Sequence, residues 1–263
     1  MKIEVQGLSF HYNSVPVLEN ISLVLEPRKV TCVIGPNGAG KTTLLKVIAS
    51  ILSPSKGAVY IDGKDCKLYD PKELARLIAY EEPYISRDLP MTVLDFLLTA
   101  RYPYHKILRY FESIEDLEIV DAVAKDLNIS HLLSRRLDQL SSGELQRVII
   151  SHALIKKPSV LLLDEPSAFL DIRYRFEILD YVKKYTAKEG LVTVVAIHDL
   201  HLASMYCDLV VVMDRGRIVY SGSPLEVFTS GIVEKVYGIE IDLVKLSDEK
   251  LVVVPKPRRD FLG

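Results

Sequence analysis

Cysteine is scarce in this sequence: Cys32, Cys66 and Cys207 stand far apart among 263 residues. They form no CxxC pair, so their spacing indicates neither a zinc site nor a disulfide framework. A chain without disulfides is typical of a reducing compartment, and we therefore expect a cytoplasmic protein.

The sequence also lacks an excess of charge of one sign and any long apolar run. Lys and Arg total 33 against 35 Asp and Glu, which argues against a nucleic-acid partner, because such partners favour a basic surface. The longest apolar stretches, such as 160–163 and 191–197, are far shorter than the roughly 20 residues that cross a bilayer. The first ten residues alternate like a strand, so we expect no cleaved signal peptide. A role at a membrane would require partner chains.

What is present is an ordinary globular composition, with 49% hydrophobic and 26% charged residues. Apolar spacing predicts helices from about 92 to 155, and an alternation of strand and helix after that point. Such alternation is typical of a parallel sheet covered on both faces. The predicted strands are 2–5, 21–25, 30–34, 59–61, 77–80, 160–163, 192–197 and 209–213, with a C-terminal hairpin at 239–246 and 251–254. The predicted helices of the second half are 174–186, 200–205 and one that begins at Ser223-Pro224.

A phosphate-binding pattern follows the strand 30–34. Gly35-Pro36-Asn37-Gly38-Ala39-Gly40-Lys41-Thr42 fits GxxxxGK[ST] and leads into an apolar helix. Glycines let backbone N–H groups curl around phosphate oxygens, Lys41 can neutralise the outer phosphates, and Thr42 can ligate Mg²⁺. A glycine-rich turn without a ligand is the alternative, but the strand–loop–helix context favours a nucleotide.

Two other predicted strands end in polar residues that could meet the phosphates. The buried run 160–163 leads into Asp164-Glu165, of which Asp164 can hold Mg²⁺ and Glu165 can polarise the attacking water. His198 follows the strand 192–197 and could bond the terminal phosphate. A solvated strand end and an ordinary surface or core histidine are the alternatives.

A helix start at Leu140-Ser141-Ser142-Gly143-Glu144 contains an S-x-x-E capping box formed by Ser141 and Glu144. Read alone, it is only a helix cap. If it has a function, that function is anion binding by a helix N-terminus.

In this order, the motifs resemble those of the ABC ATPase family over nearly the whole chain. The resemblance identifies Gly35 to Thr43 as Walker A, Leu140 to Glu144 as the signature, Val160 to Glu165 as Walker B, Ala168 to Asp171 as the D-loop and His198 as the switch histidine. It also places Tyr12 against the adenine ring, although a tyrosine there can be simple packing. Serine at position 142 and glutamate at 144 replace a glycine and the glutamine of the usual LSGGQ; both can still cap and orient the helix, so we expect retained function.

The resemblance implies a single α/β domain, 1–263, with a P-loop NTPase (RecA-like) core and an N-terminal antiparallel β-subdomain. The expected divisions are 1–85 and 156–220 for the ATP-binding core, 86–155 for an inserted helical subdomain, and 221–263 for a C-terminal helix and hairpin. It further implies a head-to-tail homodimer, in which Ser141 and Gly143 of one subunit face the phosphate held by Lys41 of the other. ATP and Mg²⁺ are the implied cofactors.

Within the family, the chain is similar to ATP subunits of importers for iron chelates, haem or cobalamin. The similar segments are 100–104, 206–208 and 236–239. Such a subunit would lie at the cytoplasmic face of the membrane, beneath permease subunits and, through them, a substrate-binding protein. The alternative is a soluble ABC ATPase that assembles a complex such as an iron–sulfur carrier. A GTPase or small-molecule kinase is disfavoured, because no N-K-x-D segment is present.

After the strand 77–80 the family supplies a glutamine that touches Mg²⁺ and the membrane subunit, whereas this chain has Glu81-Glu82-Pro83. We assign Glu82 to that position, with Pro83 as the alternative from an ungapped count. A carboxylate can also ligate Mg²⁺. It adds negative charge near the phosphates, and we therefore expect an altered metal dependence.

Overall fold

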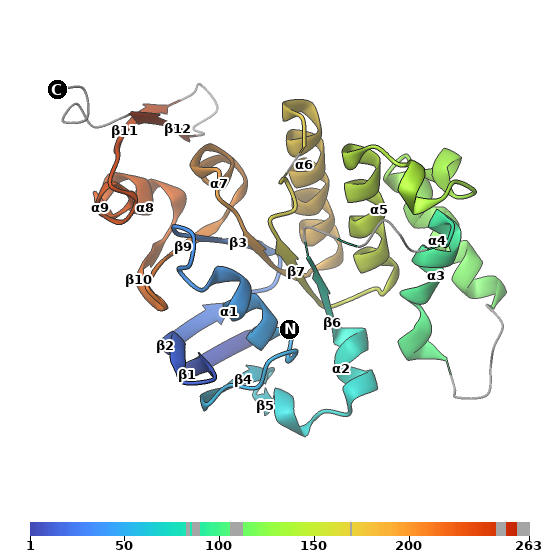
Figure 1. Ribbon diagram of the computed structural model, residues 1–263, viewed down its shortest axis with the longest axis horizontal. Helices are drawn as coiled ribbons and strands as arrows, with labels where there is room; N and C mark the ends of the chain where they lie inside the picture. Colours follow the sequence, from blue (N-terminus) through green and yellow to red (C-terminus); the bar gives the residue numbers. More distant parts are fainter. Residues whose placement is uncertain (83–84, 86–89, 106–112, 169, 246–250, 257–263) are drawn as a thin grey trace.

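The computed structural model describes residues 1–82, 85, 90–105, 113–168, 170–245 and 251–256 (Figure 1). The strands in these ranges are β1 (Ile3–Tyr12), β2 (Val15–Leu25), β3 (Lys29–Ile34), β4 (Lys56–Ile61), β5 (Lys64–Asp65), β6 (Ile78–Glu81), β7 (Val160–Asp164), β8 (Val192–Ala196), β9 (Leu209–Asp214), β10 (Arg217–Gly222), β11 (Glu240–Lys245) and β12 (Leu251–Lys256). The α-helices are α1 (Lys41–Ile48), α2 (Pro71–Leu77), α3 (Val93–Thr99), α4 (Ile114–Asp126), α5 (Ser142–Ile155), α6 (Ile172–Glu189), α7 (Leu200–Tyr206), α8 (Pro224–Thr229) and α9 (Ile232–Tyr237).

The central sheet has the order β10-β9-β3-β8-β7-β6. Every pair from β9 to β6 is parallel, and β10 adds an antiparallel edge. Side chains of β7 alternate between the two faces: Leu161 and Leu163 belong to one core cluster, and Val160 and Leu162 to the other. This alternation confirms the predicted parallel sheet that is covered on both faces, because a strand alternates its side chains across the sheet.

An antiparallel sheet of order β2-β1-β4-β5 packs on one face, together with α1. The other face carries helices α3 to α7 in a single buried cluster with strand residues such as Cys32 and Leu161. Because helices and strands share this core, the boundary of the helical subdomain at 86–155 stays a prediction. The C-terminal hairpin β11–β12 was predicted within a residue or two, and the Oγ of Ser204 on α7 donates to the carbonyl of Leu251 at 2.7 Å.

The structure corrects the expectation drawn from the cysteines. Cys32 on β3 and Cys207 after α7 form a disulfide, with Cα atoms 5.7 Å apart. Their 175-residue separation hid this proximity. The chain returns beside β3 after α7, where the N–H of Asp208 donates to the carbonyl of Val30 at 2.8 Å. Cys66 is free and buried, and burial raises its pKa to about 11.

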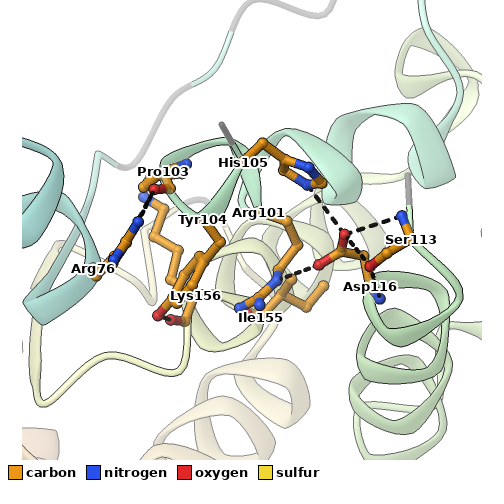
Figure 2. A network of polar contacts seen from close by, with 9 residues as sticks. All are labelled: Arg76, Arg101, Pro103, Tyr104, His105, Ser113, Asp116, Ile155 and Lys156. Carbon is orange, nitrogen blue, oxygen red and sulfur yellow. Dashed lines mark hydrogen bonds and ion pairs between the residues drawn. The ribbon is translucent and has the colours of Figure 1, made fainter. Parts of the chain in front are cut away.

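A buried polar network ties the 3₁₀ turn Tyr102–Tyr104 to the helices around it (Figure 2). Arg101 donates from Nε to Asp116 on α4 at 2.8 Å and from Nη1 to the carbonyl of Ile155 at 3.1 Å. The Nε2 of His105 lies 3.1 Å from the other oxygen of Asp116. Burial alone would raise the pKa of Asp116, but hydrogen bonds from Arg101 and Ser113 outweigh it and lower that pKa.

We predict that Asp116→Asn destabilises the fold by about 3 kcal/mol at neutral pH, because it leaves the Arg101 guanidinium buried without its counter-charge. Since the pKa of Asp116 is lowered on folding, this stabilisation is present above the ordinary carboxyl pKa of 3.8 and is lost as the pH falls below it. Urea unfolding at several pH values measures both effects. Asp121→Asn on the same helix is the control: its pair with Lys125 is exposed, so we expect a change within about 0.5 kcal/mol. Equal losses for the two variants would contradict the prediction.

Candidate functional site

The predicted phosphate loop joins the end of β3 to the start of α1, as its sequence pattern requires. Gly40, the N-cap of α1, has φ +99°, a left-handed value that favours glycine. A Cβ at Gly40 would lie 2.9 Å from Leu18 Cδ2, and one at Gly35 would lie 2.3 Å from the carbonyl oxygen of Met213. Pro36, Asn37, Gly38, Ala39 and Thr43 complete the loop and the first turn, with Asn37 and Gly38 exposed. The glycines therefore permit a turn that other residues could not form.

Lys41 is buried under this loop. Its Nζ donates to the carbonyls of Gly35 at 2.8 Å and Pro36 at 3.1 Å. Burial lowers the pKa of Lys41, while the negative charges of Glu165 and Asp164 oppose that shift. The two carboxylates thus lie within electrostatic range of the loop, although 124 residues or about half the chain separates them from it in sequence. A phosphate would offer Lys41 stronger, charge-assisted partners than two carbonyls.

The carboxylate pair lies at the end of β7, the neighbour of β8 in the sheet. Asp164 is buried, and its Oδ1 has no hydrogen-bond partner within the part of the chain that the structure describes. Burial raises the pKa of Asp164, and a hydrogen bond with the Thr42 side chain opposes this. A buried carboxylate oxygen without a donor, next to a hydroxyl, fits a Mg²⁺ ion, which prefers such hard oxygen ligands.

Glu165 turns away from the line of β7. Its φ of +50° is left-handed, which is unusual for a residue other than glycine, asparagine or aspartate. Its N–H donates to the carbonyl of Ala196 at 3.0 Å, and its Oε1 lies 2.5 Å from Nε2 of His198. Backbone strain of this kind is concentrated at functional sites. The turn brings the carboxylate and the imidazole, which are 33 residues apart, into direct contact.

The signature segment caps helix α5 as predicted. The Oγ of Ser141 accepts from the N–H of Glu144 at 3.3 Å, and the carboxylate of Glu144 accepts from the N–H of Ser141 at 2.8 Å. The N–H and the hydroxyl of Ser141 both donate to the Glu144 carboxylate, and these two bonds lower the pKa of Glu144. Ser142 is exposed on the first turn, and Gly143 packs so closely that a Cβ would lie 3.0 Å from the ring of Tyr174. In Figure 1, α5 and α1 lie on either side of β7. Their apolar side chains belong to different core clusters of the sheet.

The two glutamates after β6 have different partners. Glu81 is buried, with Oε1 2.8 Å from Nδ1 of His152 on α5 and 3.5 Å from Nζ of Lys156, the C-cap of that helix. Glu82 is exposed and pairs with Lys46 of α1 at 2.7 Å. Glu82 raises the pKa of Asp164 and Lys46 lowers it, so both charges act on the carboxylate site. Pro83, the alternative for this position, lies outside the described residues. Lys46 is a site neighbour that the sequence analysis missed; its only signal was a polar position within the apolar helix after the loop.

Two further predicted residues lie at the edges of the site. Tyr12, at the end of β1, is exposed and packs edge-to-face on Phe10, with ring centroids 4.8 Å apart. Asp171 is exposed and precedes α6, where its side chain makes no capping hydrogen bond. Both side chains are exposed, and among the described residues neither forms a hydrogen bond with the phosphate loop.

The ends of β3, β7 and β8 thus bring a lysine-bearing phosphate loop, a carboxylate pair and a histidine to one edge of a parallel sheet. This combination defines a P-loop ATPase, because phosphoryl transfer depends on such positioned charges. The family model described as "ABC transporter" matches residues 18–168. The chain belongs to the ABC transporter family.

Individual relatives agree with this placement. The chain is 35% identical over 254 residues, 97% of this chain and 93% of the relative, to the petrobactin import ATP-binding protein FpuC of Bacillus anthracis. It is 30% identical over 243 residues to the ferric enterobactin transport ATP-binding protein FepC of Escherichia coli, covering 92% of this chain and 89% of that protein. It is 34% identical over 259 residues to the uncharacterized ABC transporter ATP-binding protein YvrA of Bacillus subtilis, covering 98% of this chain and only 59% of that longer relative.

Among solved structures, the ADP conformation of MJ1267, an ATP-binding cassette of an ABC transporter, superposes with a TM-score of 0.80. It shares 28% sequence identity and covers 90% of this chain and 98% of its own. The predicted fold class is therefore confirmed. Within the described residues, none of the helices combines the length and apolar character needed to span a bilayer.

We predict that Glu82→Gln raises the Mg²⁺ concentration for half-maximal ATP hydrolysis about two- to tenfold, because it leaves the Lys46 charge uncompensated near Asp164. ATP affinity measured in EDTA should change less than twofold, since Lys41 and the loop are untouched. Mg²⁺ titration of ATPase activity tests this. Glu26→Gln, which neutralises an exposed glutamate paired with Lys29, is the control. Superimposable titration curves for wild type and Glu82→Gln would contradict the proposed position.

Proposed function

We propose that this chain is the ATP-hydrolysing subunit of an importer for a metal chelate of the iron-siderophore, haem or cobalamin class. The observation that carries the catalytic part is the contact of Glu165 with His198 at the same sheet edge as Lys41. The import part is supported by the likeness to FpuC and FepC, whose names state petrobactin import and ferric enterobactin transport.

In this proposal the residues around the phosphates have separate roles. Lys41 releases the carbonyls of Gly35 and Pro36 and binds the outer phosphate oxygens. Glu165 orients the attacking water and accepts its proton, while His198 holds the Glu165 carboxylate and can donate to the terminal phosphate. Asp164 and the Thr42 hydroxyl would hold Mg²⁺. When bound, that ion supplies positive charge that neutralises the phosphates.

A second copy of the chain would complete the site. Ser141, Ser142, Gly143 and Glu144 stand at the start of α5, a 14-residue helix whose N-terminus favours anions. In this proposal these residues reach a nucleotide held by another subunit, since α5 and α1, the helix that follows the phosphate loop, belong to the two different core clusters of the sheet. A head-to-tail dimer brings the capped end of α5 from one subunit over the phosphates held by Lys41 of the other, with Asp171 and Tyr12 at the edges of the composite site.

The face proposed for the membrane-spanning permease is a groove of about 470 Å³ between the end of α1, α2 and the turn at Pro103. Apolar side chains stand exposed around it: Ile51 is 57% exposed, and Tyr102, beside Pro103, is 75% exposed. Exposed apolar groups of this kind are typical of protein interfaces. Tyr80 of β6 lines the same groove two residues before Glu82, so a partner in this groove would lie close to the metal site. Such a partner would hold the chain at the cytoplasmic face of the membrane.

We predict that Glu165→Gln retains ATP binding and lowers the hydrolysis rate by about 10²- to 10⁴-fold, the usual contribution of a positioned general base. The amide keeps the size of the side chain but cannot accept the proton. Phosphate release measures hydrolysis, and light scattering with ATP measures dimerisation, which we expect to persist. Glu177→Gln on α6, whose exposed partner is Arg173, should hydrolyse ATP at the wild-type rate. Full activity of Glu165→Gln would remove this residue from its proposed role.

We also predict that a membrane permease copurifies with the chain and that Tyr102→Glu weakens this association at least tenfold, because a charge replaces an exposed apolar contact. ATP affinity of the separate subunit should be unchanged. Tyr220→Glu is the matched control, since Tyr220 is exposed on β10, at the opposite edge of the sheet from β6. Copurification with a soluble partner alone would instead support a scaffold in complex assembly.

A further inference from the structure

The first glycine of the phosphate loop is bonded to the far end of the chain. The N–H of Gly35 donates to the hydroxyl of Tyr237 at 2.7 Å, across 202 residues of sequence. Tyr237 is the last residue of α9, and its ring packs against the main core cluster. Burial raises the pKa of Tyr237 to about 12, so the hydroxyl is protonated at neutral pH. None of the catalytic roles described above uses this contact.

Gly35 is held through both of its backbone polar groups. Its N–H bonds to Tyr237, and its carbonyl accepts from Lys41 Nζ at 2.8 Å. The space around its Cα is so tight that a Cβ would lie 2.3 Å from the carbonyl oxygen of Met213. A shift of Gly35 would therefore displace either β9 or the loop that begins here, since interiors packed this closely do not deform gradually.

The two bonds respond differently to a nucleotide. The ammonium of Lys41 has three N–H donors and bonds the carbonyls of Gly35 and Pro36, so a phosphate would share or draw away part of its hold on Gly35. The bond to Tyr237 uses the N–H of Gly35, which belongs to the preceding peptide group, and need not change. Whichever partners Lys41 takes, the hydroxyl of Tyr237 therefore keeps its bond to Gly35.

Tyr237 has a firm support of its own. Helices α8 and α9 contact each other, and α8 also contacts α7 and β9. Val233 of α9 and Phe228 of α8 are fully buried. The hairpin that follows α9 is bonded to α7 through Ser204 and Leu251 at 2.7 Å. The described C-terminal residues, 223–245 and 251–256, are therefore packed on the core beside the phosphate loop, which Tyr237 contacts.

We propose that Tyr237 is a positioning residue for ATP binding, which holds the phosphate loop in its binding shape through the N–H of Gly35. This inference rests on the proposed role of the loop Gly35 to Thr43. The C-terminal segment would then contribute to the ATP site. We expect Tyr237 to affect the affinity for ATP and not the rate of hydrolysis, because Glu165 and His198 have the proposed roles at the terminal phosphate.

Tyr237→Phe tests the proposal, because it removes only the hydroxyl and leaves the Gly35 N–H without its acceptor. We expect ATP affinity to fall about three- to tenfold, a loss in the range of one hydrogen bond, while kcat at saturating ATP stays within twofold of wild type. Hydrogen exchange of the peptide that contains Gly35, measured by mass spectrometry with ATP bound, should become faster. Unchanged ATP affinity together with unchanged exchange would overturn the proposal.

Two control variants separate positioning from general loosening. Tyr181→Phe removes a hydroxyl that is buried without a partner in the described part of the chain, and it should leave ATP affinity unchanged. Val233→Ala creates a cavity in the same helix as Tyr237 without touching its hydroxyl. We expect it to lower the melting temperature at least as much as Tyr237→Phe but to keep wild-type ATP affinity. If Val233→Ala weakens ATP binding equally, the effect is a loss of packing and the proposal is wrong.

A third variant tests the function on which the inference depends. Lys41→Ala should abolish measurable ATP binding. Retained binding in Lys41→Ala would reject the proposed phosphate loop itself, whereas wild-type ATP affinity and wild-type exchange in Tyr237→Phe would reject only the positioning role.

Discussion

The parallel register of β3, β8 and β7 is the constraint on which the site depends. Val33 of β3 and Asp164 of β7 both stand opposite Ala196 of β8. The three strands therefore end at one level. The residues that follow them, which include Gly35, Glu165 and His198, lie close together without a long connecting loop. A slip of one residue would turn every side chain of a strand to the other face and would also move its functional residue out of reach. The apolar side chains that determine the register thus also determine where the residues at the strand ends lie.

Glu165 shows how one residue leaves this regular arrangement. If Glu165 continued β7, its side chain would point to one face of the sheet. The left-handed turn directs it to His198 instead. Such a backbone conformation costs on the order of 1 kcal/mol for a residue with a Cβ. The bond from its N–H to Ala196 and the contact with His198 offset that cost. The strain is located at the residue for which we propose a catalytic role, while Asp164, one residue earlier, stays in the strand and is buried.

Much of the fold could be predicted because its strands are buried on both faces and its loops carry distinct chemistry. Val160 to Leu163 is apolar throughout, so its position and that of the carboxylate pair at its end follow from the sequence. The capping box of Ser141 and Glu144 is local, and it was found for the same reason. Contacts between distant segments leave no such pattern. The disulfide of Cys32 with Cys207 and the bond of Gly35 to Tyr237 depend on tertiary packing, and neither composition nor spacing indicates them.

The neighbouring glutamates Glu81 and Glu82 divide two tasks that a single residue could not perform. Glu81 is buried and held by His152 and Lys156, so it anchors the end of β6 to α5. Glu82 is exposed and paired with Lys46, and exposed pairs exchange partners at little cost. The charge of Glu82 is therefore balanced by Lys46. In the proposed function, where Glu82 takes the position at which the family has glutamine, a metal ion would compete with Lys46 for these oxygens. A fixed and an exchangeable carboxylate thus follow each other at the end of β6, so a partner in the proposed groove, which Tyr80 lines, would act on Glu82 while β6 stays in place.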